Sequence, residues 1–281
     1  MDVLTLWFWP LVALIVLPAA LVYFGLHVVG RGIIFVDLAL AQIAALGIAT
    51  AVLLGADPEH SILPYALAIL FTMAGAALFS LTRFRHPRVP QEAIIGIIYI
   101  VAAAAATLVL SRTAAGDEEI KSLLVGNILL VSRAEVLRTI ALFAGVGALH
   151  YWLRRKFYLI SFDLEEAERQ GMSVRMWDFI FYATFGLIVT SFVRIAGVYL
   201  VFSYLIVPAV CGALLSSRIA VRLAIGWAVA LVAGIGGLLL STEWASLDLP
   251  TGPTIVCIFG LLLVVSGVLA MGRARSASSE A

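Results

Sequence analysis

The chain has 281 residues, of which 63% are hydrophobic and only 12% are charged, and its mean hydropathy is +1.10. A water-soluble domain carries about twice that share of charged residues, because its surface must be wetted. The composition therefore excludes an ordinary soluble domain and predicts a protein whose surface is covered largely by lipid. The net charge of +1 and the lack of a basic patch argue against nucleic-acid binding.

Apolar runs of about 20 residues, long enough to cross the hydrocarbon core as helices, recur along the chain. No stretch between them is long enough for a separate domain, so we expect residues 1–281 to form one membrane domain. The predicted fold is all-α, a polytopic transmembrane helical bundle of eight to nine spans. The candidate spans are Leu4–Val28, Ile33–Leu54, Leu63–Leu81, Ala93–Leu110, Val136–Leu153, Trp177–Ala196, Val198–Leu215, Leu223–Leu240 and Pro253–Met271.

Two stretches leave the number of spans open. The sixth and seventh runs nearly touch, which requires a tight reversal or a broken helix at residues 194–198. Between residues 112 and 133, the apolar run Ser122–Val131 is too short to cross the membrane. This run predicts a re-entrant or interfacial helix.

The distribution of Lys and Arg orients the spans, because positively charged loops stay on the cytoplasmic side of the membrane. With the loop Thr82–Glu92 inside and the sides alternating, thirteen of the 18 Lys and Arg residues lie in the cytoplasm. We therefore expect the N-terminus outside and the C-terminus inside. The acidic loops Gly55–His60 and Thr242–Asp248 then lie outside, as suits the mouth of a cation pathway.

Five stretches carry patterns that occur together in one transporter family. The chain resembles the permease subunits of the metal-type bacterial ABC transporter family, whose cargoes are zinc, manganese or chelated iron. The resemblance implies an ABC importer permease fold in the inner membrane, working as a homodimer. It also implies a cytoplasmic ATP-binding subunit and a periplasmic or surface substrate-binding protein as partners. The stretches, in the family's order, are Gly32–Gly47, Leu123–Leu129, Ser161–Met172, Ala196–Ala209 and Leu249–Pro253.

The third of these stretches also predicts a short polar helix on the cytoplasmic side. Asp163 is a suitable N-cap, acidic residues follow in the first turn, and Gly171 stands at the end. The resemblance implies that this segment, about residues 157–176, docks on the ATP-binding subunit as a coupling helix, and an ordinary surface helix is the alternative. The coupling residues would be Asp163, Glu165, Glu166, Arg169 and Gly171.

No nucleotide-binding motif accompanies this helix. The two lysines of the chain do not belong to the Gly-Lys-Ser/Thr triplet with which a P-loop holds phosphate and magnesium. We therefore expect ATP to be hydrolysed by a separate subunit, and we expect neither an enzymatic activity nor a cofactor in this one.

The second span departs from the family pattern at the residues that matter for metal transport. The resemblance implies a gate of one Asp and one His, four residues apart, a donor pair that suits zinc or manganese. The equivalent positions hold Leu38 and Gln42, so the metal ligands stay unknown. Asp37 lies one residue earlier, about 100° around the helix. It marks either a transport pathway or an interfacial group that snorkels to water.

Other polar residues are weaker candidates for the pathway. Gln42 either coordinates a cation through its amide oxygen or hydrogen-bonds between helices. In the seventh span, Pro208 frees a backbone carbonyl for a substrate, and the polar residues before it either line the pathway or pack in a kink. These residues are Tyr199, Ser203 and Tyr204. His60, in an outer acidic loop, is a weak metal signal and fits a solvated loop better.

The sequence thus predicts the membrane-spanning permease of an ABC importer for a divalent transition metal, zinc or manganese. Two alternatives stay open. An ABC permease for a non-metal small solute would explain the missing gate ligands. An ion-gradient-driven secondary carrier would require a titratable relay inside the spans.

Overall fold

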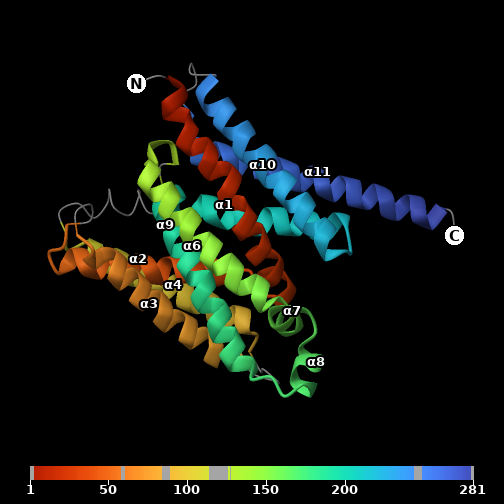
Figure 1. Cartoon of the computed structure of the whole chain (residues 1–281), viewed down its shortest axis with the longest axis horizontal. Coiled ribbons are helices and arrows are strands. Elements are labelled where there is room, and N and C mark those ends of the chain that lie inside the picture. The colour runs from red at the N-terminus through yellow and green to blue at the C-terminus, as the bar shows by residue number, and fades with distance from the viewer. Residues whose placement is uncertain are drawn as a thin grey trace. The chain divides into compact units, whose positions relative to one another are not determined.

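The structure is a computed structural model that describes residues 3–57, 61–83, 89–113, 126, 128–243 and 249–279. Every regular element in these ranges is a helix, as the apolar runs predict (Figure 1). The elements are α1 (Val3–Arg31), α2 (Val36–Leu53), α3 (Leu63–Leu81), α4 (Gln91–Leu110), η1 (Ile128–Leu130), α6 (Arg133–Trp152), α7 (Arg154–Phe162), α8 (Leu164–Arg169), α9 (Val174–Leu215), α10 (Ile219–Glu243) and α11 (Thr251–Ser279).

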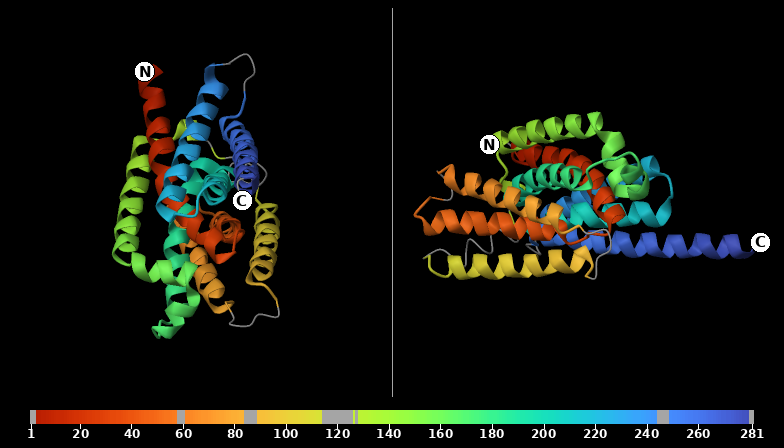
Figure 2. Two further views of the ribbon diagram at one scale, coloured as in Figure 1. Left: turned by 90° about the vertical axis from the view of Figure 1, so that its right-hand side faces the viewer. Right: turned by 90° about the horizontal axis from the view of Figure 1, so that it is seen from below.

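Among the described residues, seven helices are long and apolar enough to cross a membrane, namely α1, α2, α3, α4, α9, α10 and α11. The successive helices α6 and α7 bend by 77° and add an eighth span if they are counted together (Figure 2). The polytopic helical bundle is therefore confirmed, whereas the expected number of eight to nine spans is not. The lower number arises because α9 covers both the sixth and the seventh predicted span.

The predicted break between those two spans is present in α9. Gly197 has φ 75° and ψ 163°, which interrupts the helix in a backbone conformation that glycine adopts without strain. A Cβ atom on Gly126 would collide with the backbone at Ala196 and Gly197. Gly126 thus contacts the backbone at the break in α9, because neither Gly126 nor Gly197 has a side chain. Residues 114–125 and 127, where a re-entrant helix is expected, lie outside the described residues.

The chain forms two compact units. Unit 1 contains residues 1–29, 127–140 and 199–281, and unit 2 contains residues 30–126 and 141–198. In unit 1, α10 packs against α11, and the hydroxyl groups of Ser241 and Thr251 are 2.9 Å apart. A Cβ atom on Gly237 would lie 2.9 Å from the Cα atom of Ile255, so the lack of a side chain permits this close helix contact.

In unit 2, α2 packs against both α3 and α4, and the three helices run side by side in Figures 1 and 2. A Cβ atom on Gly47 would lie 2.6 Å from the carbonyl oxygen of Leu67, so α2 and α3 are in backbone contact there. Between α3 and α9, the hydroxyl groups of Thr72 and Thr190 are 3.0 Å apart. Small residues and hydroxyl pairs of this kind hold helices together in lipid, where apolar burial provides no net driving force.

Candidate functional site

The predicted coupling segment forms the helix α8, whose N-terminus begins at Asp163. The Asp163 carboxylate accepts a hydrogen bond of 3.1 Å from the backbone N–H of Glu166, which confirms the predicted N-cap. Asp163 is also the residue at which α7 ends. Because one residue ends α7 and starts α8, the two helices meet without a flexible linker.

The C-terminus of α8 is closed by Gly171, at φ 70°. The Gly171 N–H donates to the Glu168 carbonyl at 2.9 Å, and the Met172 N–H donates to the Ala167 carbonyl at 3.1 Å. This pair of bonds is the Schellman motif, in which a left-handed glycine satisfies the last carbonyls of a helix. Both ends of α8 are therefore fixed by hydrogen bonds within the segment itself.

The remaining predicted coupling residues lie on the outer face of α8. Glu165 and Arg169 are exposed, and Arg169 forms an ion pair with Glu166 one turn earlier. Ala167 is fully buried and anchors the opposite face. The helix therefore presents charged side chains outward, as a docking surface requires, while its role in docking stays a prediction.

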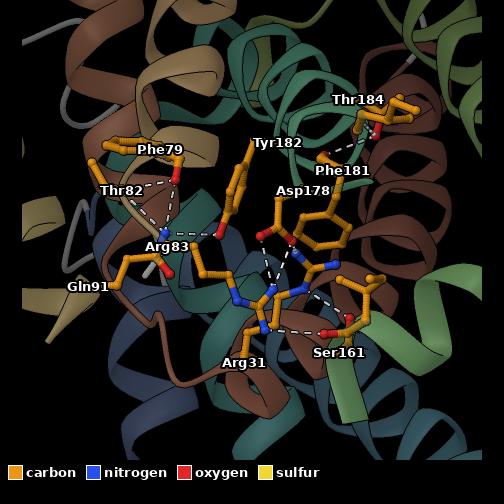
Figure 3. Close-up of polar contacts among 12 residues, drawn as sticks. Arg31, Phe79, Thr82, Arg83, Gln91, Ser161, Asp178, Phe181, Tyr182 and Thr184 are labelled. Carbon is orange, nitrogen blue, oxygen red and sulfur yellow. Dashed lines mark hydrogen bonds and ion pairs between the residues drawn. The ribbon is translucent and has the colours of Figure 1, made fainter. Parts of the chain in front are cut away.

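The residues beside α7 and α8 form a buried ion-pair cluster that we call the Asp178 cluster, made of Arg31, Arg83 and Asp178 (Figure 3). The Arg31 Nη1 atom is 2.6 Å from Asp178 Oδ1, and the Arg83 Nη1 atom is 2.8 Å from Oδ1 and 3.0 Å from Oδ2. The exposed fractions of the side chains are 0% for Asp178, 1% for Arg31 and 17% for Arg83. One carboxylate thus neutralises part of two guanidinium charges away from water.

The Asp178 cluster is bonded to the last turn of α7. Arg31 Nε donates to the Ser161 hydroxyl at 2.9 Å, and Arg83 Nη2 donates to the Ile160 carbonyl at 3.3 Å. These two acceptors lie only two or three residues before Asp163, where α8 begins. The segment that carries α8 is therefore held to the first turns of α9 through buried, charge-assisted hydrogen bonds.

Sequence reasoning gave no role to Asp178, although a signal for one was present. Asp178 is an acid one residue inside the predicted span Trp177–Ala196. An intramembrane acid calls for a buried cation as its partner. Arg31 and Arg83 had been used only as markers of cytoplasmic loops. The contacts place Arg31, Arg83 and Asp178 at one end of their helices, while the cytoplasmic location of that end stays a prediction.

The structure corrects one expectation for Asp37, that its carboxylate reaches water by snorkelling. Asp37 is 1% exposed, and in the described ranges neither of its carboxylate oxygens has a hydrogen-bond partner. The cause is its place in the first turn of α2, which packs against α3 and α4. Gln42, on the same helix, is also buried, with 8% of its surface exposed.

The other predicted pathway residues lie in unit 1, on the part of α9 that follows Gly197. The Ser203 hydroxyl donates to the Tyr199 carbonyl of its own helix at 2.9 Å. Tyr204 is fully buried and packs edge-on against Phe259, with ring centroids 4.9 Å apart, whereas Tyr199 is half exposed. Asp37 and Gln42 belong to unit 2, so the candidate pathway residues are divided between the two units.

Metal ligands do not cluster in the described ranges. Among those residues, no group of three or more His, Cys, Asp or Glu side chains is arranged to hold a metal ion. His60 and Glu59, the acidic-loop candidates, lie outside the described residues. The described side chains therefore contain no multidentate resident site of the kind that structural zinc requires.

A model of the ABC 3 transport family matches residues 4–270, almost the full length of the chain. The chain belongs to the ABC 3 transport family. The predicted resemblance to ABC transporter permeases is thereby confirmed, and the chain is a multi-pass protein of the bacterial plasma membrane, in agreement with its apolar helices.

Individual relatives of this permease cover most of its length. It is 23% identical to the manganese transport system membrane protein MntC of Halalkalibacterium halodurans, over 86% of this chain and 80% of that protein. It is 28% identical to the manganese transport system membrane protein MntB of a Synechocystis species, over 76% and 72% of the two chains. It is 29% identical to the chelated iron transport system membrane protein YfeD of Yersinia pestis, over 64% and 60%.

Solved structures resemble the permease in fold. The structure of PsaBC from Streptococcus pneumoniae in complex with Fab has a TM-score of 0.76 at 20% sequence identity, over 93% of this chain and 90% of that one. An inward-facing structure of a putative metal-chelate type ABC transporter has a TM-score of 0.72 at 17% identity, over 94% and 88%. At these identities the likeness establishes the permease fold, while the cargo depends on other observations.

Proposed function

We propose that this chain is the membrane-spanning permease of an ABC importer for a divalent transition-metal ion, with manganese favoured over zinc. The observation that carries the proposal is the family match over residues 4–270, together with relatives named for manganese and chelated-iron transport. The donor atoms support manganese. Asp37 and Gln42 offer only oxygen, and Leu38 offers no ligand, whereas zinc sites are built mainly from histidine nitrogen and cysteine sulfur.

The proposed assembly contains two copies of the permease, two copies of a cytoplasmic ATP-binding subunit and a periplasmic or surface binding protein that delivers the cargo. The chain itself hydrolyses no ATP in this scheme. Each permease would cross the membrane nine times, with α9 crossing once before Gly197 and once after it. At 1.5 Å per residue, the two parts of α9 are each roughly 30 Å long, which matches the hydrocarbon core.

In this mechanism the α8 helix receives the force of ATP hydrolysis. Docking of α8 on the ATP-binding subunit would move α7, because Asp163 joins the two helices directly. The hydrogen bonds from Arg31 to Ser161 and from Arg83 to Ile160 would then transmit the movement to Asp178 in α9. Buried, charge-assisted bonds suit this task, since they are strong and directional.

The proposal is tested by uptake of radioactive manganese in cells that lack their other manganese importers. We expect uptake to require this permease together with its ATP-binding subunit and binding protein, and to continue when the proton gradient is collapsed. Zinc should compete weakly. Uptake that stops with the gradient and survives ATP depletion would establish a secondary carrier instead. A complex whose ATPase responds only to a non-metal solute would refute the metal cargo while leaving the ABC permease in place.

A further inference from the structure

We propose that Asp37 and Glu92 together bind a divalent cation at the cytoplasmic end of unit 2, as the last binding site before release into the cytoplasm. This proposal rests on the proposed function and adds to it a second carboxylate and a location. The sequence pattern alone does not single out Glu92, which lies in the first turn of α4. Its relation to Asp37 emerges only from the packing of α2 against α4.

The two carboxylates stand at equivalent places in two adjacent helices. Asp37 is in the first turn of α2, and Glu92 is in the first turn of α4. The backbone N–H of Phe35, two residues before Asp37, donates to Glu92 Oε1 at 3.0 Å. This bond holds the Glu92 carboxylate against the turn that leads into α2. Two carboxylates at neighbouring helix ends repel each other when both are ionised.

Within the part of the chain that the structure describes, three carboxylate oxygens of this pair have no hydrogen-bond partner. Both oxygens of Asp37 and the Oε2 atom of Glu92 are buried without a hydrogen bond. Among the described residues of unit 2, Arg31 and Arg83 are bonded to Asp178. Burying a carboxylate oxygen without a hydrogen bond is costly. A bound cation of charge +2 would satisfy all three oxygens and balance both charges.

The surroundings of the pair define the class of cation and its route. The donors of Asp37 and Glu92 are oxygens, which suit manganese or ferrous iron and are poorer ligands for zinc than nitrogen or sulfur. Asp37 is buried, whereas Glu92 is partly exposed. A cation held by Asp37 therefore has a path to water past Glu92. Both residues lie at helix ends that the Lys and Arg distribution assigns to the cytoplasm.

A purely structural role predicts different behaviour. Acidic residues near a helix N-terminus stabilise the helix through its dipole, and Asp37 and Glu92 both hold such positions. Under that role, neutral variants would destabilise the metal-free protein and leave metal binding intact. Under the proposal, neutral variants relieve repulsion in the metal-free protein and abolish stabilisation by metal.

The test measures manganese binding and thermal unfolding on the purified permease complex after treatment with EDTA. The variants are Asp37→Asn, Glu92→Gln and the double variant. The matched control is Glu135→Gln, because Glu135 is also a first-turn acid, in α6, but accepts bonds from the Ser132 N–H and hydroxyl. Binding is followed by the electron paramagnetic resonance signal of free Mn²⁺, and unfolding is followed with and without Mn²⁺.

We expect each single variant to weaken manganese binding roughly tenfold or more, the scale of losses at metal sites. The metal-free variants should unfold at the same temperature as the wild type or higher, and added Mn²⁺ should no longer stabilise them. Glu135→Gln should keep the manganese-induced stabilisation. The proposed site would be refuted if both single variants bound manganese with wild-type affinity. It would also be refuted if the metal-free double variant were less stable than the wild type and Mn²⁺ still stabilised it. If the wild-type complex bound no divalent metal ion, the proposed function would be refuted instead. The uptake assay tests that function independently.

Discussion

Replacing Asp178 by asparagine should destabilise the permease more than most single substitutions at its surface. Among the described residues, the change removes the only carboxylate that forms an ion pair with Arg31 and Arg83, and it leaves both guanidinium groups largely buried. Breaking a buried ion pair by removal of one partner costs about 3–5 kcal/mol. We expect about 3 kcal/mol, the lower end, because the asparagine oxygen still accepts one bond and Arg83 is 17% exposed.

The measurement is reversible unfolding of the detergent-solubilised permease, compared between wild type, Asp178→Asn, Arg83→Gln and the double variant. Arg83→Gln should cost less than Asp178→Asn, since it leaves Arg31 paired with Asp178. The double variant should be more stable than the sum of the single losses predicts, because it removes one charge of each sign. A loss below about 1 kcal/mol for Asp178→Asn, or strict additivity, would refute the idea that the cluster stabilises unit 2.

Three further predictions concern docking, orientation and cargo. Exchanging the charges of Glu166 and Arg169 as a pair keeps their ion pair but reverses the pattern that α8 presents. The ATP-binding subunit should therefore be lost on affinity purification of the permease, and full co-purification with normal uptake would exclude α8 as the docking helix. A reporter active only in the cytoplasm should work at the C-terminus and fail at the N-terminus, and activity at both ends would mean an even number of spans. The double substitution Gln42→His and Leu38→Asp rebuilds a carboxylate–imidazole pair, so the purified permease should retain more zinc. An unchanged zinc content would argue that these positions do not face the cargo.

Much of the fold follows from local sequence patterns. The apolar runs predict where the long helices lie, and for α3 they give both ends, because length and apolarity largely decide whether a helix crosses lipid. The helix α11 continues eight residues beyond its predicted end at Met271. The caps of α8 are equally local, since Asp163 and Gly171 act on backbone groups at most a few residues away. The break at Gly197 also leaves a local sign, two apolar runs that nearly touch.

The contacts that distinguish this permease are not local. The partners of Asp178 lie 147 and 95 residues earlier in the chain, and no periodic pattern connects them. The burial of Asp37 was also missed, because nearness to a helix end suggests access to water, whereas the packing of α2 against two neighbours removes it. In both cases the sequence shows the charged residue. Only the tertiary structure shows which side chains contact it.

The Asp178 cluster also has a consequence for how the chain enters the membrane. Arg31 and Arg83 are synthesised 147 and 95 residues before their counter-ion. At ordinary elongation rates, about 5–20 residues per second, Arg83 waits roughly 5–20 s for Asp178 to emerge from the ribosome. In the predicted orientation, both arginines remain charged and hydrated during that time and hold the ends of the early helices on the cytoplasmic side. When α9 inserts, Asp178 removes the same two charges from water. The side chains that set the orientation during synthesis thus become part of the interior once the orientation no longer needs them.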